Sequence, residues 1–294
     1  MRRALKRKII QIIKKIKYGK LYEDVIYAQN RFKDTFGYEL NLKNPKTFNE
    51  KLQWLKLYDR TDLHTLCADK YLVRDHVQKE IGEEYLIPLV FETDKVEDVN
   101  ETNLPDYPVI VKTNHDCGTF TIIRDKSNQN WQKIHTKLQK SLDSNYYDLG
   151  KEWQYKNINP TIVIEKLLID DNGIIPKDYK FFCNNGKVSM IQLDMDKESS
   201  ISRNIYDIHW NLLDIIFFST LQNPISVPRP TFIDRMIILA EKLSSKFIFA
   251  RIDFYEVNNK IYFGEITFHP SNGFGPISPK SWDLKMGDLI KLPI

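Results

Sequence analysis

Apolar residues recur at helical spacing in the first third of the chain and in strand-like runs afterwards. Residues 22–80 follow a mostly helical pattern, which is interrupted at 44–47 by the sequence Asn-Pro-Lys-Thr. That sequence supplies a turn and, in Thr47, a residue suited to cap a helix that begins at Phe48. A further helix is expected at 69–79. We therefore expect a mostly helical N-terminal region at residues 21–105.

Short runs rich in β-branched and aromatic residues follow, bounded by turn residues. The expected strands cover residues 85–92, 107–113, 119–124, 161–168, 178–185, 187–194, 249–257 and 260–268. Helices are expected between them at 131–147 and 230–245. The predicted fold class is α+β, with a small subdomain at 106–168 and a larger one at 169–294.

The last two expected strands carry the ionisable side chains that indicate chemistry. Strand alternation places Arg251 and Asp253 on one face of the first strand, and Glu265 and Thr267 on one face of the second. A two-residue turn at 258–259 would pair Asp253 with Gly264, whereas a three-residue loop or an equivalent bulge would set Asp253 opposite Glu265.

Converging carboxylates on strands are costly to bury without a partner, and a divalent cation supplies one. Hard carboxylate oxygens suit Mg²⁺, which takes one or two carboxylates together with substrate phosphates. The alternative is an ordinary ion pair with Arg251 on an exposed face. The metal interpretation predicts the three-residue loop or the bulge.

Two further segments have the composition of nucleotide contacts. Lys112 ends an apolar strand and precedes a loop of small residues, 113–119. The ammonium group of Lys112 and the backbone N–H groups of the loop are suited to bind phosphate. The alternative is an ordinary hairpin turn. His115 in that loop is a candidate substrate contact. The charged pair Glu165-Lys166, followed by Leu167-Leu168, ends another strand. This segment is either a hinge that binds adenine through its backbone N–H and C=O groups or a plain strand end.

Charge and composition narrow the class of protein. The chain has 43 Lys and Arg and 39 Asp and Glu, but nine of the basic residues lie within residues 1–20, so the remainder carries 34 basic and 39 acidic residues, a net of −5. A nucleic-acid-binding body is therefore not expected. No apolar run is long enough to span a membrane. The three cysteines have no metal or disulfide spacing, which indicates a reducing, cytoplasmic setting.

Residues 1–20 have the pattern of a basic amphipathic helix. Their apolar residues, at positions 5, 9, 12, 13 and 16, lie along one side of a helix, with Lys and Arg over most of the rest. Such a helix can lie peripherally on an anionic inner membrane face, and each basic residue near the surface adds about 1 kcal/mol of attraction. Packing of the same stripe on the body or on a partner protein is an equally good interpretation.

The order of these segments resembles the ATP-grasp superfamily, in which two α+β subdomains clasp ATP. It is similar in particular to the TupA-like branch linked to teichuronopeptide and capsule biosynthesis, which shares the motifs F-N-E-K-L-Q-W-L-K, A-D-K-Y-x-V-R and G-E-I-T-F-H-P-S-N-G-F. The resemblance covers roughly residues 20–290.

The resemblance implies a role for each candidate residue. Lys70 and Lys112 would contact the ATP phosphates, and Glu165, Lys166 and Leu168 would hold adenine. Asp178 or Lys180 would reach the terminal phosphate or ribose. Lys180 and Arg251 would be catalytic, Arg251 by stabilising charge on the transferring phosphoryl group. Asp253 and Glu265 would bind Mg²⁺. Thr267 stands where the superfamily usually has a metal-binding asparagine, which leaves one metal or two open.

The resemblance also implies a reaction, ATP-dependent joining of a carboxylate to an amine. In this branch the expected partners are an amino acid and a sugar or polysaccharide precursor with a carboxylate, such as a uronic acid. Residues 192–210, with Asp194 and Arg203, could meet a saccharide or form an exposed loop. The alternatives are a glycosyltransferase or other sugar-modifying enzyme, and a non-catalytic nucleotide-binding scaffold at the membrane.

Overall fold

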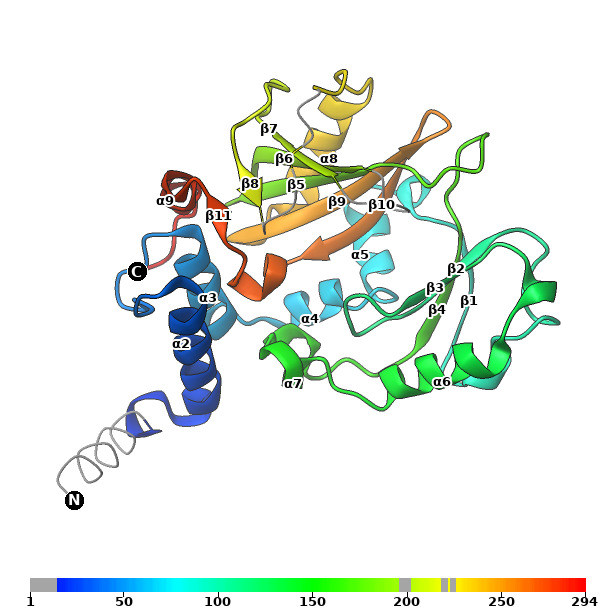
Figure 1. Cartoon of the computed structure of the whole chain (residues 1–294), viewed down its shortest axis with the longest axis horizontal. Coiled ribbons are helices and arrows are strands. Elements are labelled where there is room, and N and C mark those ends of the chain that lie inside the picture. Colours follow the sequence, from blue (N-terminus) through cyan, green and yellow to red (C-terminus); the bar gives the residue numbers. More distant parts are fainter. Residues whose placement is uncertain (1–14, 196–201, 218–221, 223–225) are drawn as a thin grey trace.

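The described chain forms two large antiparallel sheets, one small two-stranded sheet, a group of N-terminal helices and further helices that pack on the sheets (Figure 1). The computed structural model describes residues 15–195, 202–217, 222 and 226–294. Most of the expected helix at 1–20 lies outside the described residues; its residues 15–18 are helical and run into a 3₁₀ turn, η1 (Gly19–Leu21). No described helix is long and apolar enough to cross a membrane.

The helical N-terminal region predicted from the sequence is present. It consists of α2 (Tyr22–Phe36), α3 (Phe48–Tyr58), α4 (Asp62–Ala68) and α5 (Val73–Glu80). Thr47 caps α3 as predicted, because its hydroxyl accepts from the Glu50 N–H while the Glu50 carboxylate accepts from the Thr47 N–H, at 3.1 and 3.0 Å. This reciprocal capping box fixes where α3 begins.

A four-stranded sheet in the order β1-β4-β2-β3 forms the small subdomain. Its strands are β1 (Leu89–Thr93), β2 (Val109–Thr113), β3 (Phe120–Ile123) and β4 (Ile162–Lys166), and α6 (Trp131–Leu142) packs on one face. β1 comes from the chain before residue 106, so this sheet begins earlier than the segment expected for it. The expected helix at 131–147 ends at Leu142, and a separate turn of helix, α7 (Tyr147–Gly150), follows.

The large subdomain is built on a five-stranded sheet in the order β10-β9-β5-β6-β7. The strands are β5 (Asp178–Asn184), β6 (Lys187–Met195), β7 (Ser202–Tyr206), β9 (Phe249–Val257) and β10 (Lys260–Thr267). Strand alternation sends Phe181 to the core beneath α8 (Ile233–Ser244) and Phe182 to a second core beneath α3 and α9 (Lys280–Leu289). The sheet is thus covered by helices on both faces.

Short elements complete the chain. They are η2 (Glu83–Tyr85), η3 (Val96–Asp98), η4 (Lys126–Asn128), η5 (Trp153–Tyr155), β8 (Ile216–Phe217), η6 (Pro270–Gly273) and β11 (Ile277–Ser278). β8 and β11 pair with each other beside α9.

The polar face of α3 holds the loop that follows β10. Gln53 Nε2 donates to the carbonyls of Asn272 and Gly273 at 2.9 and 2.8 Å, and Lys56 Nζ donates to Asn272 O at 3.1 Å and Oδ1 at 2.5 Å. Ser271, Asn272 and Gly273 all have positive φ, at 49°, 57° and 68°. Three consecutive left-handed residues are strained, so these bonds from α3 are what keep the loop in place.

Candidate active site

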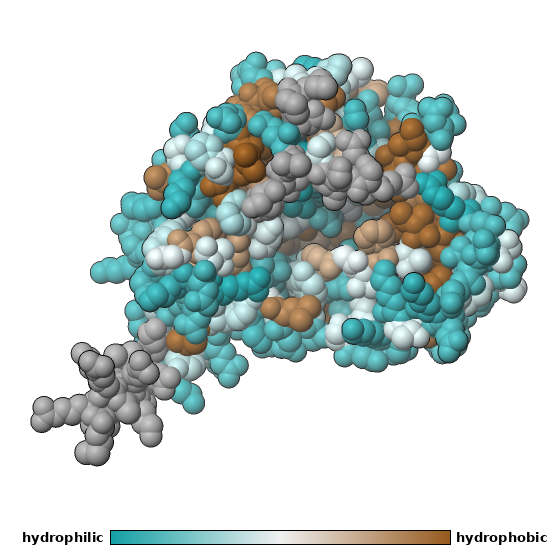
Figure 2. Space-filling view, in the orientation of Figure 1, coloured by the Kyte–Doolittle hydropathy of each residue, from teal (hydrophilic) through white to brown (hydrophobic). Residues whose placement is uncertain are grey.

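A cleft of about 450 Å³ separates the two sheets, and both contribute side chains to it. Figure 2 shows the molecule hollowed between the part with the large sheet and the part with the small sheet. The charged residues that line this cleft are Lys70, Lys112, Glu165, Lys166, Asp178, Lys180, Asp194, Asp253 and Glu265. The structure therefore brings together most of the candidates from β2, β4, β5, β6, β9 and β10.

The β9–β10 hairpin settles the register that the sequence left open. Its turn has two residues, Asn258 and Asn259, which both have positive φ (50° and 59°), as a type I′ turn requires. The register then shifts between Phe263 and Glu265, so that Glu265 pairs with Asp253. The predicted alternative of a bulge that sets the two carboxylates opposite each other is confirmed, although the loop itself has two residues rather than three.

Gly264 is the extra residue of this bulge. A Cβ atom at this position would lie 3.0 Å from Cε2 of Tyr255 and 3.1 Å from the carbonyl oxygen of Asp253. Glycine avoids that crowding, and the bulge turns Glu265 to the side of Asp253.

Arg251 and Lys180 neutralise the paired carboxylates. Arg251 donates through Nε and Nη2 to the two oxygens of Asp253, at 2.8 and 2.7 Å, and through Nη2 to Glu265 Oε1 at 2.9 Å. Lys180 Nζ lies 2.6 Å from Asp253 Oδ2 and 2.8 Å from Asp178 Oδ2. Asp253 is 1% exposed, and two cations therefore share one buried carboxylate.

Burial and charge compete in setting the pKa values of this cluster. Burial raises the pKa of Asp253, and the cations of Arg251 and Lys180 oppose that rise. For Glu265, burial favours the neutral acid, but Arg251, Lys180 and Lys70 outweigh it and lower the pKa. Burial alone would lower the pKa of Lys180, yet Asp178 and Asp253 raise it above its usual value. Glu265 therefore stays anionic and Lys180 cationic at neutral pH.

Asp253 and Glu265 have the donor chemistry of a magnesium site. Their carboxylates are hard oxygen ligands on paired residues of neighbouring strands, and both line the cleft. Among the described residues, no group of three or more His, Cys, Asp or Glu is arranged to hold a metal. A cation here would thus depend on substrate oxygens and water for the rest of its shell, as Mg²⁺ commonly does. The Thr267 hydroxyl is hydrogen bonded to Arg251 and to Glu265, each at 2.9 Å.

Across the cleft, β2 and β4 supply a second group of charges. Lys112 Nζ lies 2.6 Å from Glu165 Oε2, and Arg74 Nη1 lies 2.9 Å from Glu165 Oε1. Lys70 Nζ donates to the carbonyl of Asp116, in the loop of small residues after β2. Lys70, from the N-terminal helical region, and Lys112, from the small sheet, therefore reach the same cleft.

An apolar wall lies beside Glu165. It includes Ile87, Ile110, Ile122, Leu167 and Pro176. The Lys166 N–H donates to the Pro88 carbonyl at 3.0 Å, so this N–H is not available to a ligand, whereas the Leu168 N–H has no hydrogen-bond partner among the described residues. An aromatic base fits such an apolar wall with a backbone donor at its edge.

Four candidates from the sequence do not line the open cleft, and one of them is Thr267, which is bonded to Arg251 and Glu265. His115 is 2% exposed, and its ring contacts the carbonyls of Ser141 and Ser144, so the structure does not bring it to the cleft. Arg203 forms a salt bridge with Asp194, whose carboxylate does line the cleft. Arg251 lies behind the two carboxylates that it binds.

Arg74 was not among the candidates taken from the sequence. It belongs to the motif A-D-K-Y-L-V-R, four residues after Lys70, and one turn of helix separates such positions. That spacing was the available signal. Tyr255, two residues after Asp253 on the same strand, also lines the cleft.

The fold and the site define a nucleotide-binding protein of the ATP-grasp type. The sequence profile of the TupA-like ATP-grasp family matches residues 50–291, and the chain belongs to that family. The resemblance and the fold class expected from the sequence are thereby confirmed.

Solved structures show partial likeness to the chain. A D-alanine–D-alanine ligase from Bacillus anthracis complexed with ATP is 18% identical, with a TM-score of 0.44, and the match covers 76% of this chain and 63% of that one. An L-amino acid ligase from Bacillus licheniformis is 14% identical, with a TM-score of 0.45, and the match covers 86% of this chain and 57% of that one. This chain thus spans about 60% of the length of these structures. No curated protein matches it in sequence.

Proposed function

We propose that this protein is an ATP-dependent carboxylate–amine ligase of surface-polysaccharide biosynthesis. The observation that carries the proposal is the pairing of Asp253 with Glu265 on one wall of a cleft whose other wall holds Lys112. Carboxylates for a metal and lysines for phosphates on opposite walls are what binding of Mg-ATP needs. Membership of the TupA-like family supports the assignment.

In the proposed binding mode, the nucleotide lies along the cleft. Adenine packs on the apolar wall and accepts a hydrogen bond from the Leu168 N–H. Lys70 and Lys112 neutralise the phosphates, and Asp178 or Lys180 lies within reach of the terminal phosphate or the ribose. Asp253 and Glu265 would hold Mg²⁺, which would offset the negative charge of the phosphates.

The proposed reaction has two steps. A carboxylate oxygen of the acid substrate attacks the γ-phosphorus, the bond to the β–γ bridging oxygen breaks, and ADP leaves with an acyl phosphate formed. An amine then attacks the acyl carbon, phosphate leaves, and the amine loses a proton to give the amide. Arg251 and Lys180 supply fixed positive charge near the transferring phosphoryl group. The nucleophiles are the two substrates, so the reaction needs no nucleophile from the protein.

The substrates that we propose are an amino acid and a sugar carboxylate such as a uronic acid. Asp194, which lines the cleft with Arg203 bound to it, is the proposed contact for saccharide hydroxyls. We also propose peripheral contact with an anionic membrane through residues 1–18. Deletion of these residues should abolish binding to vesicles of phosphatidylglycerol, and unchanged binding would contradict the anchor.

The decisive experiment measures ADP release from Mg-ATP over a matrix of uronic acids and amino acids. At least one pair should give amide, ADP and phosphate in equal amounts. The Glu265→Gln variant should lose this turnover, while Glu256→Gln, on the same hairpin but not lining the cleft, should keep it. ATP binding without turnover for every pair would contradict the ligase, and no Mg-dependent ATP binding would contradict the site.

A further inference from the structure

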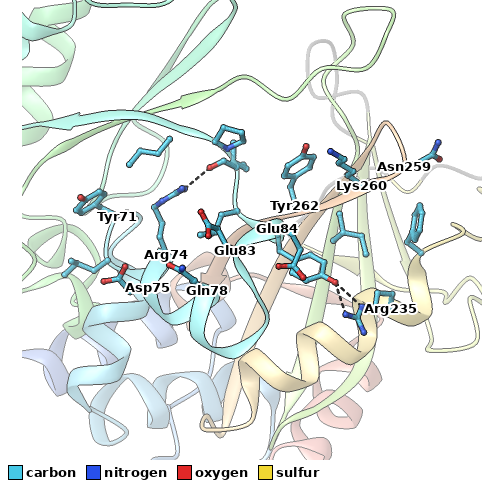
Figure 3. A pocket seen from close by; sticks show the side chains of 18 residues that line it. Tyr71, Arg74, Asp75, Gln78, Glu83, Glu84, Arg235, Asn259, Lys260 and Tyr262 are labelled. Atoms are coloured by element: carbon cyan, nitrogen blue, oxygen red, sulfur yellow. Dashed lines mark hydrogen bonds between the residues drawn. The ribbon is translucent and has the colours of Figure 1, made fainter.

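A second, larger cavity lies on the other side of the segment that connects α5 to β1. This groove has a volume of about 1030 Å³ and is bounded by α5, the connecting segment 83–89, the turn end of the β9–β10 hairpin and the start of α8 (Figure 3). Its volume is at the upper end of the roughly 300–1,000 Å³ typical of small-ligand sites. The groove can therefore take a ligand of several rings.

Charged groups of both signs line the groove in equal number. The acids are Asp75, Glu83 and Glu84, and the bases are Arg74, Arg235 and Lys260. A surface that attracts a polyanion or a polycation carries an excess of the opposite charge, and this groove carries none. This balance favours an uncharged ligand over a polyanion or a polycation.

The three carboxylates are free to accept hydrogen bonds. Within the described part of the chain, no hydrogen bond or ion pair engages the side chains of Asp75, Glu83 and Glu84, which Figure 3 shows along the lower side of the groove. The amides of Gln78 and Asn259 add groups that both donate and accept. A ligand with many hydroxyl groups satisfies such a mixture, because each hydroxyl can donate and accept.

Aromatic rings supply the apolar part of the lining. Tyr71 on the α4–α5 connection, Tyr262 on β10 and Phe232 before α8 are partly exposed and line the groove together with Tyr85. The Tyr85 hydroxyl accepts from Arg235 Nε and Nη2, at 3.1 and 2.9 Å, which orients its ring. Aromatic rings offer flat apolar faces to a ligand, and they lose little side-chain conformational entropy when it binds.

We propose that this groove binds a neutral oligosaccharide. Sugar rings present apolar C–H faces to tyrosine and hydroxyls to carboxylates, amides and guanidinium groups, so the lining satisfies both parts of the ligand at once. A purely apolar ligand would leave the polar side chains of the groove without hydrogen-bond partners, and a purely ionic ligand would leave its aromatic rings without an apolar contact. The proposal does not depend on the ligase reaction, because the groove lies outside the nucleotide cleft and is tested without nucleotide.

The test is isothermal titration and saturation-transfer NMR with tetrasaccharides of β1,4-glucose, β1,3-glucose, α1,4-glucose and β1,4-N-acetylglucosamine. Tetraglucosamine and a capped tetraserine peptide are the comparison ligands, since the first adds charge and the second removes the sugar rings. At least one neutral tetrasaccharide should bind with a dissociation constant of about 1 mM or tighter, at least tenfold below those of all comparison ligands. Tighter binding of any comparison ligand overturns the proposal, as does the absence of saccharide binding up to about 10 mM.

Variants then locate the binding site. Tyr71→Ala and Tyr262→Ala should each weaken binding about tenfold, which corresponds to roughly 1.4 kcal/mol. Tyr58→Ala, an exposed tyrosine on α3 outside the groove, is the matched control and should bind as the wild type does. The double substitution Asp75→Asn, Glu83→Gln keeps side-chain shape at exposed positions and should also weaken binding. Binding that is unchanged in all three groove variants overturns the proposal.

Discussion

At the scale of single residues, the two carboxylates of the candidate metal site differ in how deeply they are buried. The Asp253 side chain is 1% exposed and is bonded to two cations, whereas the Glu265 side chain is 41% exposed on the edge of the cleft. Removal of a buried partner leaves an uncompensated charge, but removal of a half-exposed one lets water replace it. The same chemical change should therefore have different effects at the two positions.

We expect Asp253→Asn to lower the free energy of unfolding by about 3 kcal/mol, because Lys180 and Arg251 lose their shared anion. Glu265→Gln should lower it by less than about 1 kcal/mol. Both variants should reduce ADP release at least 100-fold. Urea unfolding followed by circular dichroism, together with an ADP-release assay, measures both quantities. Equal losses of stability in the two variants would contradict this account.

Lys56 is a second buried charge, outside the cleft. It is 1% exposed, and burial lowers its pKa from 10.5 to about 7. Its ammonium lies 4.5 Å from the Phe274 ring centroid. The charged groups that act on it are Glu152, Arg31, Asp24 and Arg60.

The pKa of Lys56 predicts a dependence of stability on pH. Between about pH 7 and pH 10.5 the unfolded chain binds a proton here that the folded protein does not, so stability rises with pH in that window. Relative to Lys56→Met, the wild type should gain roughly 2 kcal/mol between pH 7 and pH 9. Urea unfolding at the two pH values measures this difference. A difference between the proteins that does not change with pH would mean that Lys56 keeps an ordinary pKa.

At the scale of secondary-structure elements, the bulge in β10 is what sets Glu265 beside Asp253 in the candidate metal site. Without the extra residue, Asp253 would face the residue before Glu265, and Glu265 would point away from the cleft. The function of the hairpin therefore depends on one position that carries no chemical group.

Gly264→Ala should lower both stability and activity. The added methyl would contact the Tyr255 ring and the Asp253 carbonyl, and the strand must shift to relieve this. We expect a loss of about 1–3 kcal/mol in stability and at least a tenfold loss of ADP release, because Glu265 moves relative to Asp253. Thermal unfolding and the ADP-release assay measure the two effects. Full activity in this variant would show that the bulge does not set the register.

The sequence predicted these elements better than the contacts between them. The two strands of the last hairpin were expected at 249–257 and 260–268 and are found at Phe249–Val257 and Lys260–Thr267, since alternation and the Asn-Asn turn are local signals. The bulge was predicted only as one of two registers, because its position depends on how β10 packs on its neighbours.

Contacts between distant segments have no local signal. Arg74 and Glu165 are 91 residues apart, and nothing in either motif shows that they pair. His115 was assigned to the cleft because it lies in a loop of small residues, but its ring turns inward to the carbonyls after α6. The loop direction follows from the packing of α6 on the sheet, which the sequence pattern does not reveal.

At the scale of the whole molecule, Arg74 links the groove to the cleft. It lines the groove, and its Nη1 donates both to the Ile87 carbonyl and to Glu165, which lines the cleft. Ile87 itself lines both cavities. A ligand that binds Arg74 in the groove therefore contacts the group that orients Glu165.

Saccharide and ATP should consequently change each other's affinity by the same factor, in the range of roughly 5–150-fold for a coupled pair of sites. Arg74→Lys should reduce this factor to near one, because a single ammonium cannot keep both bonds. Arg235→Lys, at the far side of the groove, is the matched control and should keep the coupling. Titrations of each ligand with and without the other measure the factor, and coupling that survives in Arg74→Lys would exclude this route.

The contacts of α3 also have a consequence for how the protein is made. The acceptors for Asn49, Lys51, Gln53 and Lys56 lie 216–239 residues further along the chain. At about 5–20 residues per second, a ribosome needs roughly 10–50 s to deliver them after α3 has emerged. Throughout that time the polar face of α3 has no partner and the loop after β10 does not exist. The loop after β10 can therefore dock on α3 only once synthesis has passed residue 273, long after α3 itself has emerged.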